Sequence, residues 1–445
     1  MKAYKLSILS LLTAVALLST SCESYFGDIN ADPDEPIEVT PDVLLTQVEL
    51  RLAYTVWGDF SRFGSIFDGH IDGTGRQFAV IDNYTFRGSD VDAMWANMYT
   101  AVMMDNRQMA AIAEEEGSNW YLGISQAIEA YSIMMVTDFW GDVPYSDALK
   151  GNDGSDVNQP TFDKQEDIYN AIFALIDEAR ANLAKDVGAR MPGADDLIYS
   201  GSATDWIQFL NVLEARGKLH LGKVAASNYT DALTALDKGG LSADASVTFG
   251  NGATEQAPWF QYLDQRDDID LGAAYIATID TSATGIDPRA GVYGTPLDAG
   301  VAHPVFVANQ STPLLSITEE LFIRAEATFH SKGAGAESDS ALMRAVSSSF
   351  DEAGLSADFA AYWAATDPGA GNETLELIMT EKYKALLCNP EVYNDWRRTG
   401  FPALTPKSGT DVPTRFPYAE TEVFSNSNTP SNADITIFSK VWWDK

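Results

Sequence analysis

Apolar residues recur along most of this chain at spacings of three and four, which is the period of a helix with one buried face. Residues 120–139 show the pattern clearly, because Ile124, Ile128 and Tyr131 fall on one side of the helix they would form. The same rhythm covers enough of the chain to predict a mostly α-helical fold. The expected helices span residues 42–56, 89–116, 120–139, 165–183, 202–224, 229–236, 318–331, 337–353 and 375–388.

Polar residues mark the ends of several expected helices. Ser89 with Asp92, and Ser202 with Asp205, place a hydroxyl three positions before a carboxylate. Such a pair commonly caps the start of a helix. Gly117 follows the last apolar position of the second expected helix, and glycine often terminates helices. These signals predict helix ends independently of the apolar rhythm.

The rhythm fails over residues 57–88, 239–313 and 396–445, which carry scattered Gly, Pro, Asp and aromatic residues. Irregular stretches longer than about 15 residues are uncommon in compact domains and are often functional. The overall order is paired helices, a long loop-rich excursion, more paired helices and an irregular tail. It predicts tetratricopeptide-like stacking, which repeats about every 34 residues, although most consensus residues of that repeat are missing.

The start of the chain has a different pattern. Lys2 and Lys5 precede an apolar run over residues 6–18, and small residues lead up to Cys22. This is the layout of a secretory signal peptide, and a cysteine at that place resembles the lipobox of bacterial lipoproteins. We predict a signal peptide over residues 1–21 and lipidation at Cys22; the alternative is cleavage that leaves Cys22 an ordinary residue. Other apolar runs fall short of the about 20 residues that cross a bilayer.

The composition of the chain narrows the set of possible functions. The 29 Lys and Arg against 64 Asp and Glu give a net charge of −35, which argues against binding nucleic acid or anionic lipid because both require cations. Residues 22–41 are acidic and contain proline, so we expect a lipid anchor and tether there, followed by one ligand-binding domain over residues 42–445. The remaining cysteine, Cys388, is expected to be a small buried thiol within the helix over residues 375–388.

Residues that would indicate an enzyme are missing from the sequence. Residues 217–223 resemble a phosphate loop, but Val224 replaces the required Ser or Thr, and the stretch lies in a helical pattern. A glycosidase needs a pair of carboxylates, and no pair stands out. We therefore predict no catalysis, no cofactor and no metal. The histidines, none of them paired at metal-ligand spacing, are His70, His220, His303 and His330.

Acidic loops leave one metal open as an alternative. Carboxylate oxygens are the ligands that Ca²⁺ prefers, although a solvated acidic face explains the same residues. The carboxylates in question are Asp153, Asp156, Asp264 and Asp270.

Two aromatic stretches, residues 67–84 and 259–275, have the composition of a sugar-binding surface. Aromatic rings stack on the apolar faces of sugars, and Asp, Asn and Arg bind their hydroxyl edges. The alternative is that these rings only pack loops against the helices. The candidate ligand-binding residues are Asp72, Arg76, Tyr84, Trp259, Tyr262 and Arg266.

Other aromatic and charged residues are expected to be structural. Trp140 closes a helix ahead of a Gly-Asp-x-Pro turn. Trp396, Arg397 and Arg398 are expected to form an internal charge network with Glu381.

A series of short motifs follows one order along the chain. In that order the chain resembles the SusD/RagB outer-membrane lipoproteins of Bacteroidetes, in particular their SusD-like second subgroup. The motifs are DINADP at 28–33, TDFWGDVPY at 137–145, DPR at 287–289, LFIRAEA at 321–327, EK at 381–382, WRRTG at 396–400, PTRFPY at 413–418, Glu422 with Asn426, and VWWD at 441–444.

The resemblance implies a SusD-like α-α superhelix of tetratricopeptide-like helix pairs with a loop-rich second half packed over them. It implies a lipid-anchored protein on the outer face of the outer membrane, seated on a SusC-like TonB-dependent transporter. It also places ligand contacts broadly in the two aromatic stretches. The expected function is capture of oligosaccharides for that transporter. Alternatives are an oligopeptide-binding protein, a glycan-processing enzyme, or a helical scaffold without a small ligand.

Overall fold

The computed structural model describes residues 39–150, 157–280, 287–297 and 303–445. The predicted signal peptide, Cys22 and nearly all of the predicted tether lie outside these residues. Asp153 and Asp156 lie outside them as well.

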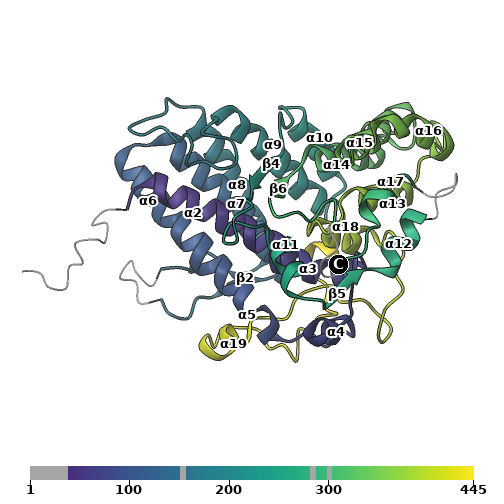
Figure 1. Ribbon diagram of the computed structural model, residues 1–445. Coiled ribbons are helices and arrows are strands. Elements are labelled where there is room, and N and C mark those ends of the chain that lie inside the picture. The colour runs from purple at the N-terminus through teal and green to yellow at the C-terminus, as the bar shows by residue number, and fades with distance from the viewer. Residues whose placement is uncertain (1–38, 151–156, 281–286, 298–302) are drawn as a thin grey trace, which may run out of the picture. The chain divides into compact units, whose positions relative to one another are not determined.

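Antiparallel helices form the first half of the described chain, as the amphipathic pattern predicts (Figure 1). Consecutive helices pack against each other: α6 on α7, α7 on α8, and α9 on α10. The most buried is α7, which is apolar on nearly every face because neighbours cover it on several sides. These helices are α2 (Pro41–Thr55), α5 (Gly88–Ala96), α6 (Asp105–Glu116), α7 (Asn119–Trp140), α8 (Gln165–Leu183), α9 (Ala203–His220) and α10 (Ser227–Leu236).

Further helices continue the stack in the second half, where α14 packs on both α10 and α15. The prediction missed α16, whose buried face is short and rests on Tyr362 and Trp363. The mostly helical fold with paired helices is confirmed. The helices are α14 (Ile317–Lys332), α15 (Ala336–Glu352), α16 (Ser356–Thr366), α17 (Leu375–Ala385) and α18 (Glu391–Thr399).

The prediction that residues 57–88 are irregular is wrong. A π-helical turn, Val56–Phe60, continues from α2 into α3 (Ser61–Asp68), and α4 (Arg76–Asp82) follows. A π-turn holds an extra residue per turn, so it shifts the apolar rhythm and hides the helix from a period of 3.6. A second π-turn, Asn97–Met104, divides the helix expected over residues 89–116 into α5 and α6.

One of the two predicted caps is correct. The Ser202 hydroxyl accepts a hydrogen bond from the Asp205 amide at 3.4 Å, and α9 begins there. The predicted Ser89–Asp92 cap is wrong. Helix α5 begins at Gly88, and the Asp90 carboxylate accepts a hydrogen bond from the Arg87 amide, which directly precedes the helix. The Asp92 carboxylate instead accepts from the Thr421 amide, at 3.0 Å, beside α19 (Glu420–Ser425).

Residues 239–313 contain short elements where the sequence predicts only loops. The elements in this range are the strands β4–β6 and the helices α11–α13, whereas β1–β3 lie earlier in the chain. All described strands pair into antiparallel two-stranded sheets, β1 with β5, β2 with β3 and β4 with β6. The strands are β1 (Ile71–Gly73), β2 (Val143–Pro144), β3 (Phe162–Asp163), β4 (Ala245–Thr248), β5 (Ile269–Leu271) and β6 (Ser311–Leu315); the helices are α11 (Pro258–Gln265), α12 (Ala273–Asp280) and α13 (Ala290–Tyr293).

The C-terminal tail is mostly irregular, and two of its segments, residues 412–419 and 441–444, enter the core. Trp140 is fully buried and its indole N–H donates to the Pro417 carbonyl at 2.7 Å, which confirms its structural role. Phe416 packs edge-on against Trp140, with ring centroids 5.7 Å apart. Trp443, in the short 3₁₀ turn Trp442–Asp444, is also fully buried. The tail therefore closes the aromatic core beside the C-terminal end of α7.

Buried charges form a network near the one predicted, with different partners. Arg398 pairs with Glu326 and Asp395, each at 2.6 Å. Glu381 pairs instead with Arg289 at 2.6 Å and Lys384 at 2.9 Å. Burial alone would raise the pKa of Glu381, but these two cations outweigh burial and lower it to about 2. The predicted grouping of Glu381 with residues 396–398 is therefore wrong.

Cys388 is buried, as predicted, but it lies beyond α17. Its φ of 58° belongs to the left-handed region, so the predicted helix over residues 375–388 ends earlier, at Ala385. Across the described part of the chain, every helix is too short or too polar to span a membrane.

Candidate functional site

The pairing of β1 with β5 brings the two predicted aromatic stretches together. Asp72 lies opposite Asp270 in this two-stranded ribbon, which runs antiparallel. The amides of Thr74 and Gly75 extend the pairing by donating to the Asp268 carbonyl, at 2.8 and 3.1 Å. Segments far apart in the sequence therefore form one surface.

Two glycines allow the chain segments around the ribbon to approach closely. A Cβ on Gly73 would lie 2.1 Å from the Phe78 carbonyl oxygen, and one on Gly272 would lie 2.0 Å from the Gly69 carbonyl oxygen. Both contacts are with backbone atoms, which cannot rotate away. Glycine is therefore required at both positions.

Asp268 organises one side of the ribbon. Its side chain is nearly fully buried, and one carboxylate oxygen accepts from Arg76 at 2.8 Å. The other oxygen lies 3.4 Å from the Tyr262 hydroxyl and 3.6 Å from the Arg266 guanidinium. Three of the predicted site residues thus surround one carboxylate. The sequence placed Asp268 in the correct stretch but gave no sign of its central role.

A cavity of about 250 Å³ opens on this side, between the π-turn Val56–Phe60, α4 and α11; we call it the arginine pocket. Tyr262 is half-buried at its wall, with Arg62 over the ring at 4.8 Å and Phe78 edge-on at 5.3 Å. Burial raises the pKa of the Tyr262 hydroxyl, so the group stays neutral at physiological pH. The polar residues of the arginine pocket are Asp59, Arg62, Gln77, Gln261, Gln265 and Arg266.

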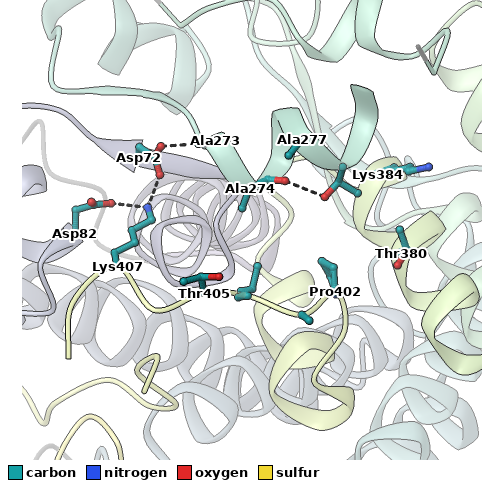
Figure 2. A pocket seen from close by; sticks show the side chains of 13 residues that line it. Asp72, Asp82, Ala273, Ala274, Ala277, Thr380, Lys384, Pro402, Thr405 and Lys407 are labelled. Carbon is teal, nitrogen blue, oxygen red and sulfur yellow. Dashed lines mark hydrogen bonds and ion pairs between the residues drawn. The ribbon is translucent and has the colours of Figure 1, made fainter. Parts of the chain in front are cut away.

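A larger cavity of about 760 Å³ is lined by Asp72 of β1 and by residues of α4, α12, α17 and the C-terminal tail; we call it the lysine pocket (Figure 2). Lys407 reaches across one side of it, with its ammonium 2.5 Å from Asp72, 2.6 Å from Asp82 and 2.9 Å from the Ile71 carbonyl. The contacts with Asp82 and Ile71 are hydrogen bonds, and the contact with Asp72 is an ion pair. The second oxygen of Asp72 accepts from the Ala273 amide at 3.0 Å.

The rest of the lysine pocket is lined by hydroxyl and methyl groups. Thr380 and Thr405 contribute side chains to its wall, with alanines from α12 opposite. Lys384 also borders the cavity, but Figure 2 shows its ammonium directed away. That ammonium binds Glu381 and the Tyr362 hydroxyl, at 2.9 and 3.0 Å. Carboxylates and hydroxyls therefore dominate what this cavity offers.

Tyr84 and Trp259 occupy supporting positions. The half-buried Tyr84 accepts a hydrogen bond from the Lys407 amide at 2.9 Å, so it holds the segment that carries the lysine. Trp259 is fully buried, stacks on Phe306 at 4.6 Å, and donates its indole N–H to Ser61 at 2.8 Å. The ring of Trp259 offers no face to solvent, and its stretch is the helix α11 rather than an irregular loop.

The sequence analysis missed Arg62, Asp82 and Lys407. Arg62 lies just after the π-turn that hides the helical pattern, Asp82 ends the short helix α4, and Lys407 stands alone in the irregular tail. No local spacing links Lys407 to the ribbon, because the contact joins positions more than 300 residues apart, as its bonds to Asp82 and Ile71 show.

The described residues contain no group of three His, Cys, Asp or Glu arranged to hold a metal. Of the aspartates considered for calcium, Asp270 directs one oxygen at the amides of Leu271 and Leu297, at 2.7 and 3.2 Å. That oxygen serves the fold. What the ribbon can do chemically is bind: it presents a ring, guanidinium groups, carboxylates and hydroxyls around two open cavities.

A stack of paired helices carrying a loop-rich ligand surface defines a class of helical binding proteins. A family described as "Starch-binding associating with outer membrane" matches residues 33–419. This chain belongs to that family, the SusD-like proteins, as the motifs indicate. Proteins of this family are binding proteins rather than enzymes.

Solved structures agree on the fold. A SusD/RagB family protein from Bacteroides thetaiotaomicron superposes with a TM-score of 0.73 at 21% identity, over 92% of this chain and 99% of its own. A chitin-binding protein gives 0.75 at 20%, over 91% and 100%. A chitin-binding SusD homologue from Flavobacterium johnsoniae gives 0.69 at 20%, over 91% and 97%. No protein of curated function matches the sequence.

Proposed function

We propose that this protein captures oligosaccharides at the cell surface and delivers them to a SusC-like TonB-dependent transporter in the outer membrane. Family membership supports glycan binding, and two similar structures are of chitin-binding proteins. The observation that carries the proposal is the β1–β5 ribbon. It sets the half-buried ring of Tyr262 beside guanidinium and carboxylate groups, the combination that sugars require.

The proposed location is the outer leaflet of the outer membrane, facing the exterior. The signal peptide over residues 1–21 would be removed, Cys22 lipidated, and residues 22–41 would tether the domain. The family's association with the outer membrane supports this location. Mass spectrometry of the protein from its native host should find acyl chains on an N-terminal Cys22, and an unmodified N-terminus would refute the anchor.

Within the site, we assign ligand contact to Asp72, Arg76, Tyr262 and Arg266. Tyr84 and Trp259 are assigned structural roles instead, because Tyr84 binds the Lys407 amide and Trp259 is fully buried. Truncating Trp259 is therefore expected to lower the free energy of unfolding by about 3–5 kcal/mol, as for other buried aromatics, so it is a poor probe of binding.

Tyr262→Ala is the sharper test. Loss of one stacking ring is expected to weaken oligosaccharide binding roughly tenfold, or about 1–1.5 kcal/mol, in titration calorimetry with the glycan that an array screen identifies. The matched control is Tyr229→Ala on α10, a half-buried tyrosine stacked on His330. Equal affinity in both variants would remove Tyr262 from the site.

The same screen separates the other functions. Binding of peptides in place of glycans would favour an oligopeptide carrier. Release of reducing ends from polysaccharides by the pure protein would show an enzyme.

A further inference from the structure

We infer that the arginine pocket selects a sugar carrying a carboxylate, so that the ligand of this protein is an acidic glycan. The inference rests on the proposed function and concerns the same ribbon. It starts from the guanidinium groups gathered there. Arg62 pairs with Asp59, while Arg76 and Arg266 share Asp268, so three cations meet two carboxylates.

Much of the donor capacity at these arginines is unused. Arg62 donates one N–H to the Asp59 carboxylate at 2.7 Å, and its buried Nε has no hydrogen-bond partner among the described residues. Arg266 is about half exposed, and its closest carboxylate oxygen, on Asp268, is 3.6 Å away. That distance exceeds a hydrogen bond. Both guanidinium groups border the arginine pocket, and the half-exposed one of Arg266 is the one whose N–H groups are open to a ligand, since the Nε of Arg62 is buried.

Free guanidinium donors favour a particular acceptor. A carboxylate accepts two parallel N–H bonds from one guanidinium, and such charged pairs are roughly twice as strong as neutral ones. Gln77 and Gln265 also border the cavity and can bind sugar hydroxyls. The half-buried Tyr262 ring lines the same cavity and can contact the sugar there. At about 250 Å³ the arginine pocket is smaller than most ligand pockets, so it suits one acidic unit of a longer chain.

The strongly negative charge of the whole protein does not prevent this. Charges are screened over about 8 Å at physiological ionic strength. A ligand carboxylate in contact with Arg266 is within that range of the guanidinium groups, whereas most of the surplus acids are spread over the rest of the surface. The net charge of −35 slows the approach of acidic glycans, and the local groups determine which sugar is held.

The test compares acidic glycans with their own carboxyl-reduced forms. Titration calorimetry on the purified full-length protein uses oligogalacturonate, oligoalginate and hyaluronan oligosaccharides, each beside its reduced counterpart. At least one acidic probe is expected to bind on the order of tenfold tighter than its reduced form, with the preference shrinking as salt rises. If every reduced form binds as well as its acidic parent, or no acidic probe binds, the inference is overturned.

Arg266→Gln should abolish the preference for the acid, because it weakens binding of the acidic form much more than binding of the reduced form. The control is Arg190→Gln, which removes an arginine of similar exposure that pairs with Glu116; the preference should persist there. Because Arg266 is half exposed, we expect the variant to fold, and circular dichroism checks this directly. A preference that survives Arg266→Gln and Arg266→Glu also overturns the inference.

Two failures are distinguishable. Binding of neutral glycans alone refutes the acidic ligand and leaves the proposed function intact. Binding of no glycan at all refutes both. Tight, Arg266-dependent binding of oligoglutamate in place of sugars refutes the glycan and assigns the pocket to an acidic peptide.

Discussion

The arginine and lysine pockets both lie beside the β1–β5 ribbon, yet they offer a ligand different groups. In the lysine pocket the cation is fully occupied, because Lys407 already binds Asp72, Asp82 and a backbone carbonyl. In the arginine pocket the half-exposed guanidinium of Arg266 lies 3.6 Å from its nearest carboxylate oxygen, beyond hydrogen-bonding distance. The charge of a side chain therefore says less about its role than the number of its donors that the fold has already used.

Because the two pockets offer different groups, we expect them to bind different kinds of sugar unit. Carboxylates and threonine hydroxyls in the lysine pocket suit the hydroxyls of a neutral sugar, whereas the arginine pocket suits an acidic one. Lys407 is then a positioning residue, since its ammonium is held by Asp72, Asp82 and the Ile71 carbonyl and fixes the two carboxylates.

Breaking the ribbon should eliminate both pockets at once. Gly73→Ala places a Cβ against the Phe78 carbonyl, so we expect the free energy of unfolding to fall by more than about 4 kcal/mol, among the largest effects of single substitutions. Urea denaturation measures this. Gly291→Ala in α13 is the control, because its Cβ would meet nothing within 4 Å; a similar loss in both variants would contradict the role of the ribbon.

Removing the Lys407 ammonium should destabilise the lysine pocket and leave the arginine pocket intact. Lys407→Met leaves Asp72, Asp82 and the Ile71 carbonyl without their shared donor, and we expect a loss of about 2–3 kcal/mol in the same assay. The exposed pair of Lys332 with Glu337 serves as control, since Lys332→Met should cost less than about 1 kcal/mol. A Lys407 variant as stable as that control would show that the lysine does not hold the pocket together.

A smaller effect is the dependence of the free energy of unfolding on pH. Asp68 precedes Gly69, whose neighbours Ala274 and Leu404 line the lysine pocket. Burial raises the pKa of Asp68 to about 8 against an ordinary 3.8, despite the nearby Lys407 and a bond from the His70 amide at 2.9 Å. Between these values the folded state holds a proton that the unfolded state has released. Stability should therefore fall as pH rises from about 4 to 8.

The slope from this one group is at most about 1.4 kcal/mol per pH unit. Asp68→Asn removes the titrating proton, so unfolding measured from pH 5 to pH 9 should show a flatter decline in the variant than in the original protein. Parallel curves would mean that Asp68 is already ionised in the fold.

The helical stack was largely predictable because each helix repeats its apolar positions locally. Helix α8, for example, matches the predicted residues 165–183. Helix α3 was not predictable, since the π-turn before it breaks the period. The site divides in the same way. Tyr262 and Arg266 were identified from the composition of one stretch, whereas Lys407 required contacts that no local pattern encodes.

Trp443 has a consequence for how the protein matures. It is fully buried, and its indole N–H binds Asp138 at 2.9 Å, near the end of α7. The aromatic core therefore cannot close until a segment near the far end of the described chain has arrived. During synthesis the earlier helices are therefore expected to expose apolar surface to chaperones and proteases until that segment is made.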